Sequence, residues 1–365
     1  MKKIVVILLS FLMLFLVSCD KKDKEDHVAQ NFNFDSEKAM ELGREAMDAI
    51  AHNNLKELEG ISDSEVVDAI KVQDKSTYNI TAYQLLDAVQ RGKKEMYKFN
   101  VAKAVKSEPK AILEEYYIRV DKKEDDKYQI GKISGSDSIF AEAQGQQVRI
   151  RFKDKVNMDT LIKLSEIPSE AYIKSVSSDI RRVPVPKKSF KAIGLSFEQK
   201  FAMIATVEDN RSYVAVLEFN QLPPSGGSSD KGGDSSKAAG QDMSISSGLQ
   251  QVLEKSIATK ITTLDIFKDI DIDYLIFSND GKYNIISYKN EYGVSRFKLY
   301  KNAGDKVKLN FDDLFDPEKY EITYLSCQYE KLKFNVKAAE GKEGIRKEVI
   351  GTYSLDLEDM KVQKI

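Results

Sequence analysis

The chain has 365 residues, of which 31% are charged and 42% hydrophobic, and it contains two Cys, two His and no Trp. This apolar content excludes a disordered protein, and so few cysteines exclude a disulfide-stabilised scaffold. The 56 basic residues nearly balance the 58 acidic ones, so the net charge of −2 gives no electrostatic basis for binding nucleic acid. Two histidines argue against most zinc sites and His-based catalytic triads.

The first residues have the pattern of a secretory signal. Lys2 and Lys3 form a short basic segment, and an apolar run extends from Ile4 to Val17. As a helix this run would be about 21 Å long, short of the roughly 30 Å of a hydrocarbon core. The pattern therefore predicts a cleaved signal peptide over residues 1–18 rather than a permanent transmembrane helix.

The apolar run ends in Leu-Val-Ser-Cys at positions 16–19. This tetrapeptide resembles the lipobox of bacterial lipoproteins; an ordinary signal peptide followed by an incidental Cys is the alternative. The resemblance implies that Cys19 is the lipidated first residue of the mature protein and that acyl chains anchor it to a membrane. Three acyl chains, as in that family, exceed the two signals needed for lasting attachment. The overall composition is also similar to that of spirochaete proteins.

Acylation of Cys19 would leave Cys327 as the one remaining cysteine, so no intramolecular disulfide is expected. Cys327 lies in an alternating apolar run over residues 322–329. This alternation predicts a buried side chain that packs as a small hydrophobe.

Two segments are predicted to lie outside the folded core. Residues 19–35 begin with a run of charged side chains and are expected to form a solvated tether between lipid and domain. Residues 223–248 are rich in Gly and Ser and are expected to form a flexible insertion. The segments between and after them should fold.

From residue 36 to residue 110 the apolar spacing predicts a helical module. Ser36 is the expected N-cap of its first helix, and Gly60 is expected to end that helix. The three expected helices cover residues 36–60, 62–71 and 81–98.

From about residue 112 the apolar period changes to two, which predicts β-strands. Turn signals separate these short strands, so antiparallel sheets are expected in one β-rich domain that covers residues 111–222 and 249–365. A short amphipathic helix is expected near residues 249–257. The predicted fold is therefore α+β: a small helical N-terminal module followed by an antiparallel β-rich domain, propeller-like or a sandwich. Strands are expected at residues 116–120, 128–133, 147–152, 192–197, 201–207, 213–219, 274–277, 283–288, 295–300, 322–329, 332–336 and 351–357.

Two stretches of the β-rich sequence look like copies of one unit: an apolar strand, a Ser, a short turn, a Lys, an aromatic residue and two further strands. One copy begins at Ala192, another at Tyr274, and a looser third at Ile322. The turn Ser-Asn-Asp-Gly-Lys at 278–282 resembles blade turns of WD-repeat-like and TolB-like β-propellers. The chain departs from these families in having no Trp and irregular repeat spacing, so a propeller and a non-repeating sandwich or barrel stay open as alternatives.

The sequence offers no catalytic, cofactor-binding or metal-ligating motif. His27 and His52 stand apart from any Cys or second His, so they form no zinc motif. Asp269, Asp271 and Asp273 have the alternate spacing of a calcium loop, but the Gly and Glu that such a loop requires are missing, and the segment is better interpreted as a strand with one solvated face. We expect no enzyme activity, no cofactor and no metal, although a catalytic carboxylate pair in a cleft stays open.

The expected function is that of a membrane-anchored, non-enzymatic protein-binding scaffold. β-Propeller lipoproteins of the outer-membrane-protein assembly machinery are similar in plan, which implies an accessory role in envelope assembly with protein partners. The expected location is the cell envelope, on the periplasmic face of the outer membrane. One alternative is a surface-exposed lipoprotein that binds host molecules; another is a solute-binding or enzymatic lipoprotein, which would need a deep cleft.

Overall fold

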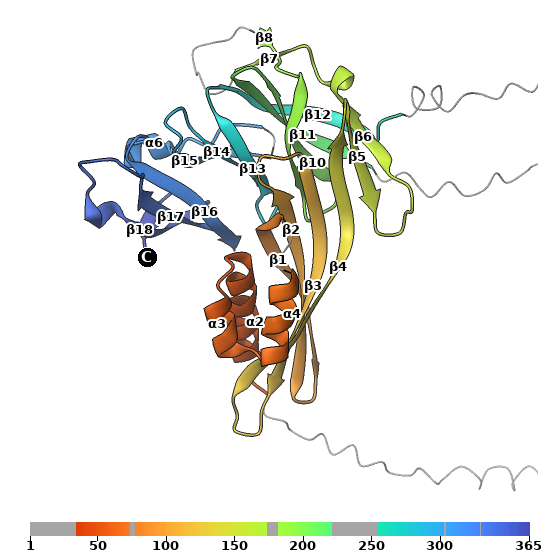
Figure 1. The fold of residues 1–365 in the computed structure, drawn as a ribbon, viewed down its shortest axis with the longest axis vertical. Coiled ribbons are helices and arrows are strands. Elements are labelled where there is room, and N and C mark those ends of the chain that lie inside the picture. The colour runs from red at the N-terminus through yellow and green to blue at the C-terminus, as the bar shows by residue number, and fades with distance from the viewer. Residues whose placement is uncertain (1–33, 74–76, 174–181, 221–254, 303, 329) are drawn as a thin grey trace, which may run out of the picture.

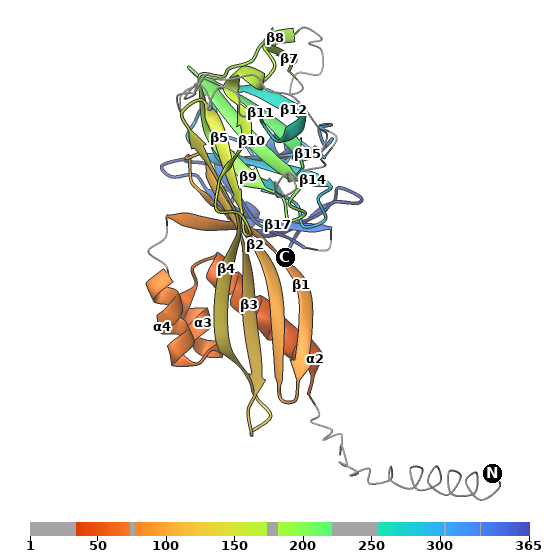
Figure 2. The same ribbon diagram turned by 90° about the vertical axis from the view of Figure 1, so that its right-hand side faces the viewer.

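The computed structural model describes residues 34–73, 77–173, 182–220, 255–302, 304–328 and 330–365. The molecule is elongated: a stalk, in which helices cover one face of a long sheet, carries a head of smaller sheets (Figures 1 and 2). Cys19, His27, most of the predicted tether and the predicted 223–248 insertion lie outside the described residues. None of the helices in the described part of the chain is long and apolar enough to span a bilayer.

Three helices open the described chain: α2 (Ser36–Ala51), α3 (Leu55–Ile61) and α4 (Ser64–Gln73). The N-cap of α2 is Asp35 rather than Ser36, and its carboxylate accepts a hydrogen bond from the Lys38 amide at 3.2 Å. The helix expected at residues 62–71 is confirmed as α4.

The expectation of one continuous helix over residues 36–60 is wrong. The chain leaves the helical conformation at Asn53, where φ is +52°, and the side chain of Asn54 then caps α3. Gly60 consequently lies inside α3 and does not end a helix.

The stalk sheet is a six-stranded antiparallel meander in which each strand pairs with the next along the chain. Its strands are β1 (Tyr78–Arg91), β2 (Lys94–Val105), β3 (Lys110–Lys122), β4 (Tyr128–Gln144), β5 (Gln147–Phe152) and β6 (Asp159–Lys163). The predicted strands at 116–120, 128–133 and 147–152 are confirmed within it.

The helix expected at residues 81–98 is wrong, because this segment forms the β1–β2 hairpin. Gly92 makes the tight turn with a φ of +59°, which suits glycine. Two irregularities in the β1 register, near Ile80 and Leu85, break its alternation, so the apolar residues of β1 have a spacing that a helix also fits. The helices therefore end at Gln73, well before residue 110.

A small hydrophobic core joins the helices to the lower half of this sheet. Ala39, Ala46 and Met47 of α2 are fully buried in the same cluster as Tyr97 and Phe99 of β2. Alternate β2 side chains thus face the helices, which is the period-two pattern of a half-covered strand.

The head consists of three successive antiparallel meanders that follow a two-stranded ribbon. Within the described residues no strand pairing closes these sheets into a barrel. Strand β12 pairs with β11, so the chain on either side of residues 221–254 contributes to one sheet. The ribbon is β7 (Glu170–Tyr172) and β8 (Arg182–Pro184), and the meanders are β9 (Ser189–Leu195), β10 (Phe201–Glu208), β11 (Arg211–Phe219) and β12 (Ala258–Lys268); β13 (Asp271–Phe277), β14 (Tyr283–Lys289) and β15 (Ser295–Lys301); β16 (Tyr320–Gln328), β17 (Lys331–Ala338), β18 (Gly351–Asp356) and β19 (Val362–Lys364).

The predicted head strands are confirmed, with boundaries that shift by a few residues. Short helical elements connect some of them: α6 (Phe311–Leu314) and 3₁₀ turns at Leu164–Glu166 and Lys347–Val349. The broad prediction, mainly antiparallel β-structure behind N-terminal helices, is confirmed. Of the amphipathic helix expected near residues 249–257, Leu249, Val252 and Leu253 lie outside the described residues.

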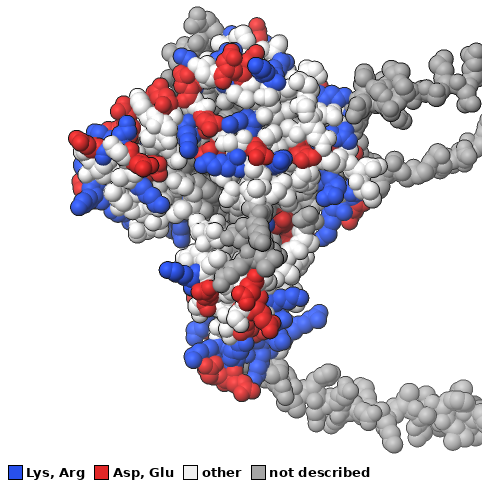
Figure 3. All heavy atoms as spheres, in the orientation of Figure 1, with Lys and Arg blue, Asp and Glu red and all other residues white. Residues whose placement is uncertain are grey.

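The surface carries both charge signs in close alternation on the head, and basic side chains gather on the lower stalk (Figure 3). Some exposed charges form ion pairs, such as Lys319 with Asp316 at 3.2 Å and Lys361 with Asp359 at 2.5 Å. Such exposed pairs contribute little to stability, and their main effect is a well-solvated surface.

Candidate binding groove

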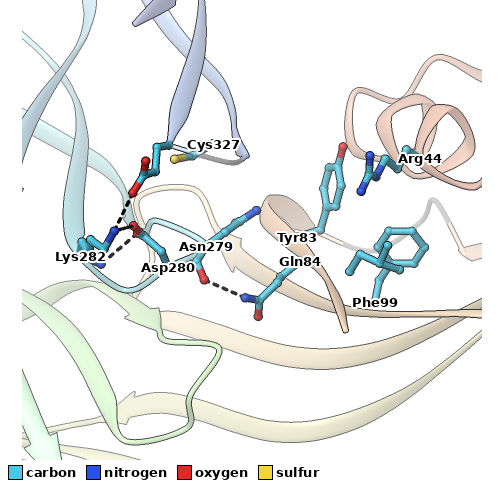
Figure 4. A pocket seen from close by; sticks show the side chains of 10 residues that line it. Arg44, Tyr83, Gln84, Phe99, Asn279, Asp280, Lys282 and Cys327 are labelled. Atoms are coloured by element: carbon cyan, nitrogen blue, oxygen red, sulfur yellow. Dashed lines mark hydrogen bonds and ion pairs between the residues drawn. The ribbon is translucent and has the colours of Figure 1, made fainter. Parts of the chain in front are cut away.

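Two adjoining cavities lie where β1 passes between α2 and the head. Their volumes are about 260 Å³ and 240 Å³, and both are lined by Tyr83 of β1 and Cys327 of β16. Because they share these two walls, we treat them together as one groove between stalk and head. Figure 4 shows the first of the two cavities.

The first cavity combines an apolar wall with a charged rim. Tyr83, Leu85 and Phe99 of the stalk and Cys327 of the head form the apolar side. The rim is made of charged side chains from α2 and from the turns of the second and third meanders: Arg44, Asp280, Lys282 and Glu330. An apolar floor with a few polar groups at its edge is typical of a binding site.

The turn between β13 and β14 positions the head side of this rim. The Ser278 hydroxyl donates to Asp280 Oδ1 at 2.7 Å and accepts from the Tyr283 amide at 2.9 Å. Gly281 follows with a φ of +67° and lets the chain reverse. These are the residues of the 278–282 motif, so the turn singled out in the sequence forms one side of the groove.

Lys282 links the two head turns that border the groove. Its Nζ lies 2.7 Å from Glu330 Oε1 and 3.3 Å from Asp280 Oδ2, and both carboxylates raise the pKa of the amine. Burial opposes ionisation of Asp280, but hydrogen bonds from Ser278 and Lys282 outweigh it and lower the pKa of this carboxyl. Asp280 and Lys282 therefore stay ionised at neutral pH.

A hydrogen bond from Gln84 Nε2 to the backbone oxygen of Asn279, at 2.8 Å, ties β1 to the same turn. The side-chain oxygen Oδ1 of Asn279 is buried and accepts no hydrogen bond from any described residue. An unpartnered buried acceptor costs free energy, so this atom is the natural acceptor for a donor group on a bound molecule.

The second cavity, on the other side of Tyr83, is more polar. Its walls carry the side chains of Thr81, Tyr274, Ser287, Ser295, Thr323, Tyr324 and Ser326, with Lys106, Asp273 and His52 also among its lining residues. The Tyr324 hydroxyl is buried without a partner among the described residues, and burial raises its pKa well above the usual value. It stays protonated at neutral pH and can donate a hydrogen bond.

The Cys327 thiol of the groove is not prepared for covalent chemistry. Burial raises the pKa of the Cys327 thiol to about 12, so the thiolate that would act as a nucleophile is scarce at neutral pH. The prediction that Cys327 is buried is confirmed. His52 is exposed at the C-cap of α2, with its Nδ1 at 2.9 Å from the Asp48 backbone oxygen. This arrangement suits non-covalent binding.

The acidic triplet considered for calcium binding is spread out. Asp269 accepts from the Asn210 amide at 2.6 Å, Asp271 pairs with Lys191 at 2.7 Å, and Asp273 pairs with Lys106 at 3.3 Å. Among the described residues no group of three or more His, Cys, Asp or Glu side chains is placed to hold a metal.

The sequence predicts one wall of the groove but not the other. Its residue pattern indicates the 278–282 turn, whereas the helix that it predicts over Tyr83, Gln84 and Leu85 does not form. The sequence feature that could have indicated a strand here is Gly92, eight residues after Gln84, because a glycine at this position is typical of a tight turn between two strands.

No family model and no curated protein matches the sequence. Among solved structures, the chain is similar to a TolB protein of Agrobacterium tumefaciens at 9% identity, with a TM-score of 0.30 over 74% of this chain and 88% of that one. It is similar to TolB of Acinetobacter baumannii at 10% identity (TM-score 0.28, 81% and 59% covered) and to the β-propeller domain of the Trilobed protease of Pyrococcus furiosus at 11% identity (TM-score 0.27, 78% and 85% covered). TM-scores this low do not establish a shared fold.

Proposed function

We propose that this protein is a lipid-anchored, non-enzymatic scaffold of the bacterial cell envelope that binds a segment of another protein in the groove between stalk and head. Within this proposal Cys19 is the lipidated residue, the protein faces the periplasm from the outer membrane, and its partner takes part in outer-membrane protein or envelope assembly.

The lining of the groove is the observation that carries this proposal. Its two cavities, of about 260 Å³ and 240 Å³, adjoin along Tyr83 and Cys327, and each combines apolar walls with polar groups. Two adjoining cavities of this size suit two side chains of one peptide. The orphan acceptor on Asn279 and the donor on Tyr324 would then meet polar groups of that peptide.

The position of the first described residues, at the lower end of the stalk, supports the anchored arrangement. The first described residue, Phe34, packs edge-on against Tyr128 with ring centroids 5.2 Å apart, and the Asp35 amide donates to the Tyr128 hydroxyl at 2.6 Å. Tyr128 begins β4 at the lower end of the stalk (Figure 2). An anchor attached at this end of the stalk would leave the groove and the head, at the other end, accessible to a partner.

Site-specific photo-crosslinking in intact cells tests the groove. A photoreactive amino acid at Lys282, on the rim, should crosslink the full-length lipidated protein to one envelope protein, expected to be an outer-membrane barrel or its assembly factor. The matched control is Lys361, an exposed lysine that also pairs with a nearby carboxylate but lies outside the groove. Crosslinks of equal yield from both positions, or no envelope protein from Lys282, would contradict the proposal.

A charge reversal at Lys282 tests the same contact without crosslinking. Lys282→Glu places a third carboxylate beside Asp280 and Glu330, so recovery of the partner without crosslinking should fall by about tenfold, while Lys361→Glu should leave it unchanged.

Protease treatment of whole cells distinguishes the two envelope locations. Persistence of the protein until the outer membrane is broken supports the periplasmic face, and its loss from intact cells supports the surface.

A further inference from the structure

The lower half of β1 is a free sheet edge. Strand β1 lies at the end of the stalk sheet and pairs with β2 alone among the described strands. Its residues 86–91 are all exposed, including Leu86 at 47% and Val89 at 50%. Native proteins usually cover or charge such an edge, because unpaired backbone groups beside apolar side chains recruit another strand.

The hairpin geometry shows which backbone groups point away from β2. A two-residue turn joins Arg91 to Lys94, so this pair closes the hairpin through a backbone hydrogen bond and its neighbours alternate along the strand. The amides and carbonyls of Ala88 and Gln90 consequently face the open edge. The amide of Ala88 donates to the Asp87 carboxylate at 2.8 Å, as expected for a group with no strand partner.

The same register defines the faces of the strand. Asp87, Val89 and Arg91 lie opposite Lys98, Met96 and Lys94 of β2, on the face that points away from the helices because Tyr97 and Phe99 point towards them. Along this face the edge therefore presents an acid, an apolar side chain and a base at equal spacing.

We propose that this edge pairs with the same edge of a second copy of the chain, antiparallel and centred on Val89. In this register Val89 lies opposite its own copy, and Asp87 lies opposite Arg91 in both directions, so two cross-strand ion pairs flank an apolar contact. The outward groups of Ala88 then meet those of Gln90. A register centred on Ala88 or Gln90 would place Asp87 or Arg91 opposite Val89 and lose both ion pairs.

The position of this edge allows such a dimer. The paired segment lies near the turn at the lower end of the stalk (Figure 2), so antiparallel pairing sends the two heads in opposite directions and brings the two lower, anchored ends together at the centre of the dimer, with both stalks lying along the membrane. The contact is isologous, as in most symmetric dimers. Pairing over six residues buries less than the roughly 1,200 Å² of a stable interface, so the dimer needs the high local concentration that membrane anchoring provides. The proposed dimer depends on the lipidation of Cys19, part of the proposed function, only for this local concentration.

Disulfide trapping tests the register in the full-length protein in its own membranes. In Val89→Cys the two introduced thiols should be about 4.5 Å apart between Cα atoms, which permits a disulfide. In the control Gln90→Cys the two copies are about 8 Å apart, too far for one. We expect mild oxidation to give a covalent dimer from the first variant with at least fivefold higher yield than from the second.

Charge reversal then distinguishes disulfides that form through the proposed strand pairing from those that form by random collision of copies in the membrane. In the Val89→Cys background, Asp87→Arg should lower the yield of covalent dimer about fivefold, and the added change Arg91→Asp should restore it. Equal yields from Val89→Cys and Gln90→Cys, failure of the double change to restore dimer, or a disulfide adduct of the Val89→Cys variant with another protein would overturn the proposal. The Lys282 photo-crosslink is independent of these readouts, so failure of one proposal leaves the other distinguishable.

Discussion

Cys327 illustrates how burial at a single residue decides chemistry. Its side chain is 4% exposed and lies on the shared wall of the two cavities, where the apolar surroundings favour the neutral thiol. Burial raises its pKa to about 12, above the 9.0 of an exposed thiol. The thiol thus helps to line the groove as an apolar contact, in agreement with its place in an alternating strand.

The pH dependence of Cys327 alkylation follows from this pKa. Between pH 7.5 and 10 the rate of reaction with iodoacetamide should rise about tenfold per pH unit without reaching a plateau, because the thiolate fraction keeps increasing below a pKa of about 12. The rate for an exposed thiol would begin to level off above pH 9 and would be roughly a thousandfold higher at pH 7.5. Mass spectrometry of the alkylated peptide measures the rate. A rate that levels off between pH 9 and pH 10 would show that the thiol is not held in its neutral form.

At the scale of elements, the first two meanders use the same turn. Ser196 accepts from the Phe201 amide at 3.1 Å, as Ser278 accepts from the Tyr283 amide at 2.9 Å. The residue three positions after each Ser has a positive φ: Gln199 at +59° and Gly281 at +67°. The two copies detected in the sequence are therefore equivalent in backbone geometry as well as in residue pattern.

This equivalence predicts the effect of one substitution. Gln199 holds a left-handed conformation that disfavours any residue with a Cβ, so Gln199→Gly should raise the free energy of unfolding by about 1 kcal/mol. Chemical denaturation of the full-length protein measures the change. The comparison is Asn54→Gly at the α3 N-cap, where φ is −91° and no such strain exists; it should lower stability by a few tenths of a kcal/mol. A loss of stability in Gln199→Gly would contradict the assignment.

At the scale of the molecule, the head is held together by close approach of its sheets. A Cβ at Gly194 of β9 would lie 2.1 Å from the backbone oxygen of Leu275 in β13, so the first two meanders meet at a position that admits no side chain. Arg296 joins β15 to the following segment, with Nη1 donating to the Tyr320 oxygen at 3.0 Å and Nη2 to the Phe315 oxygen at 3.1 Å. Packing and buried hydrogen bonds, rather than strand pairing, thus connect the meanders.

Gly194→Ala should accordingly destabilise the whole molecule. The added methyl group meets backbone that cannot move aside alone, and the expected loss in free energy of unfolding is about 3 kcal/mol. Gly60→Ala is the matched control: a Cβ there meets nothing within 4 Å inside α3, so this change should be neutral or stabilise by up to about 1 kcal/mol. Urea denaturation of both variants compares them. Similar stabilities would mean that β9 and β13 do not pack this closely.

Most strands of the head were predictable because their signals are local, although β7, β8, β12 and β19 were not predicted. Each predicted strand is a short apolar run between turn residues, and this signal lies within the strand itself. The β1–β2 hairpin was not predictable in the same way. Its bulges break the alternation, and the helices that cover Tyr97 and Phe99 come from a different part of the chain.

The sequence alone predicts the anchor at Cys19, and it determined that helices precede the β-rich part of the chain and that residues 278–282 form a turn, because each depends on residues close together in the chain. Only the tertiary structure decided that β1 lies between α2 and the third meander and that Asn279 is left with a buried unpartnered acceptor. It also decided that residues 86–91 form an open edge. These features arise from packing between segments up to about two hundred residues apart, such as Gln84 and Asn279, and such contacts leave no local pattern.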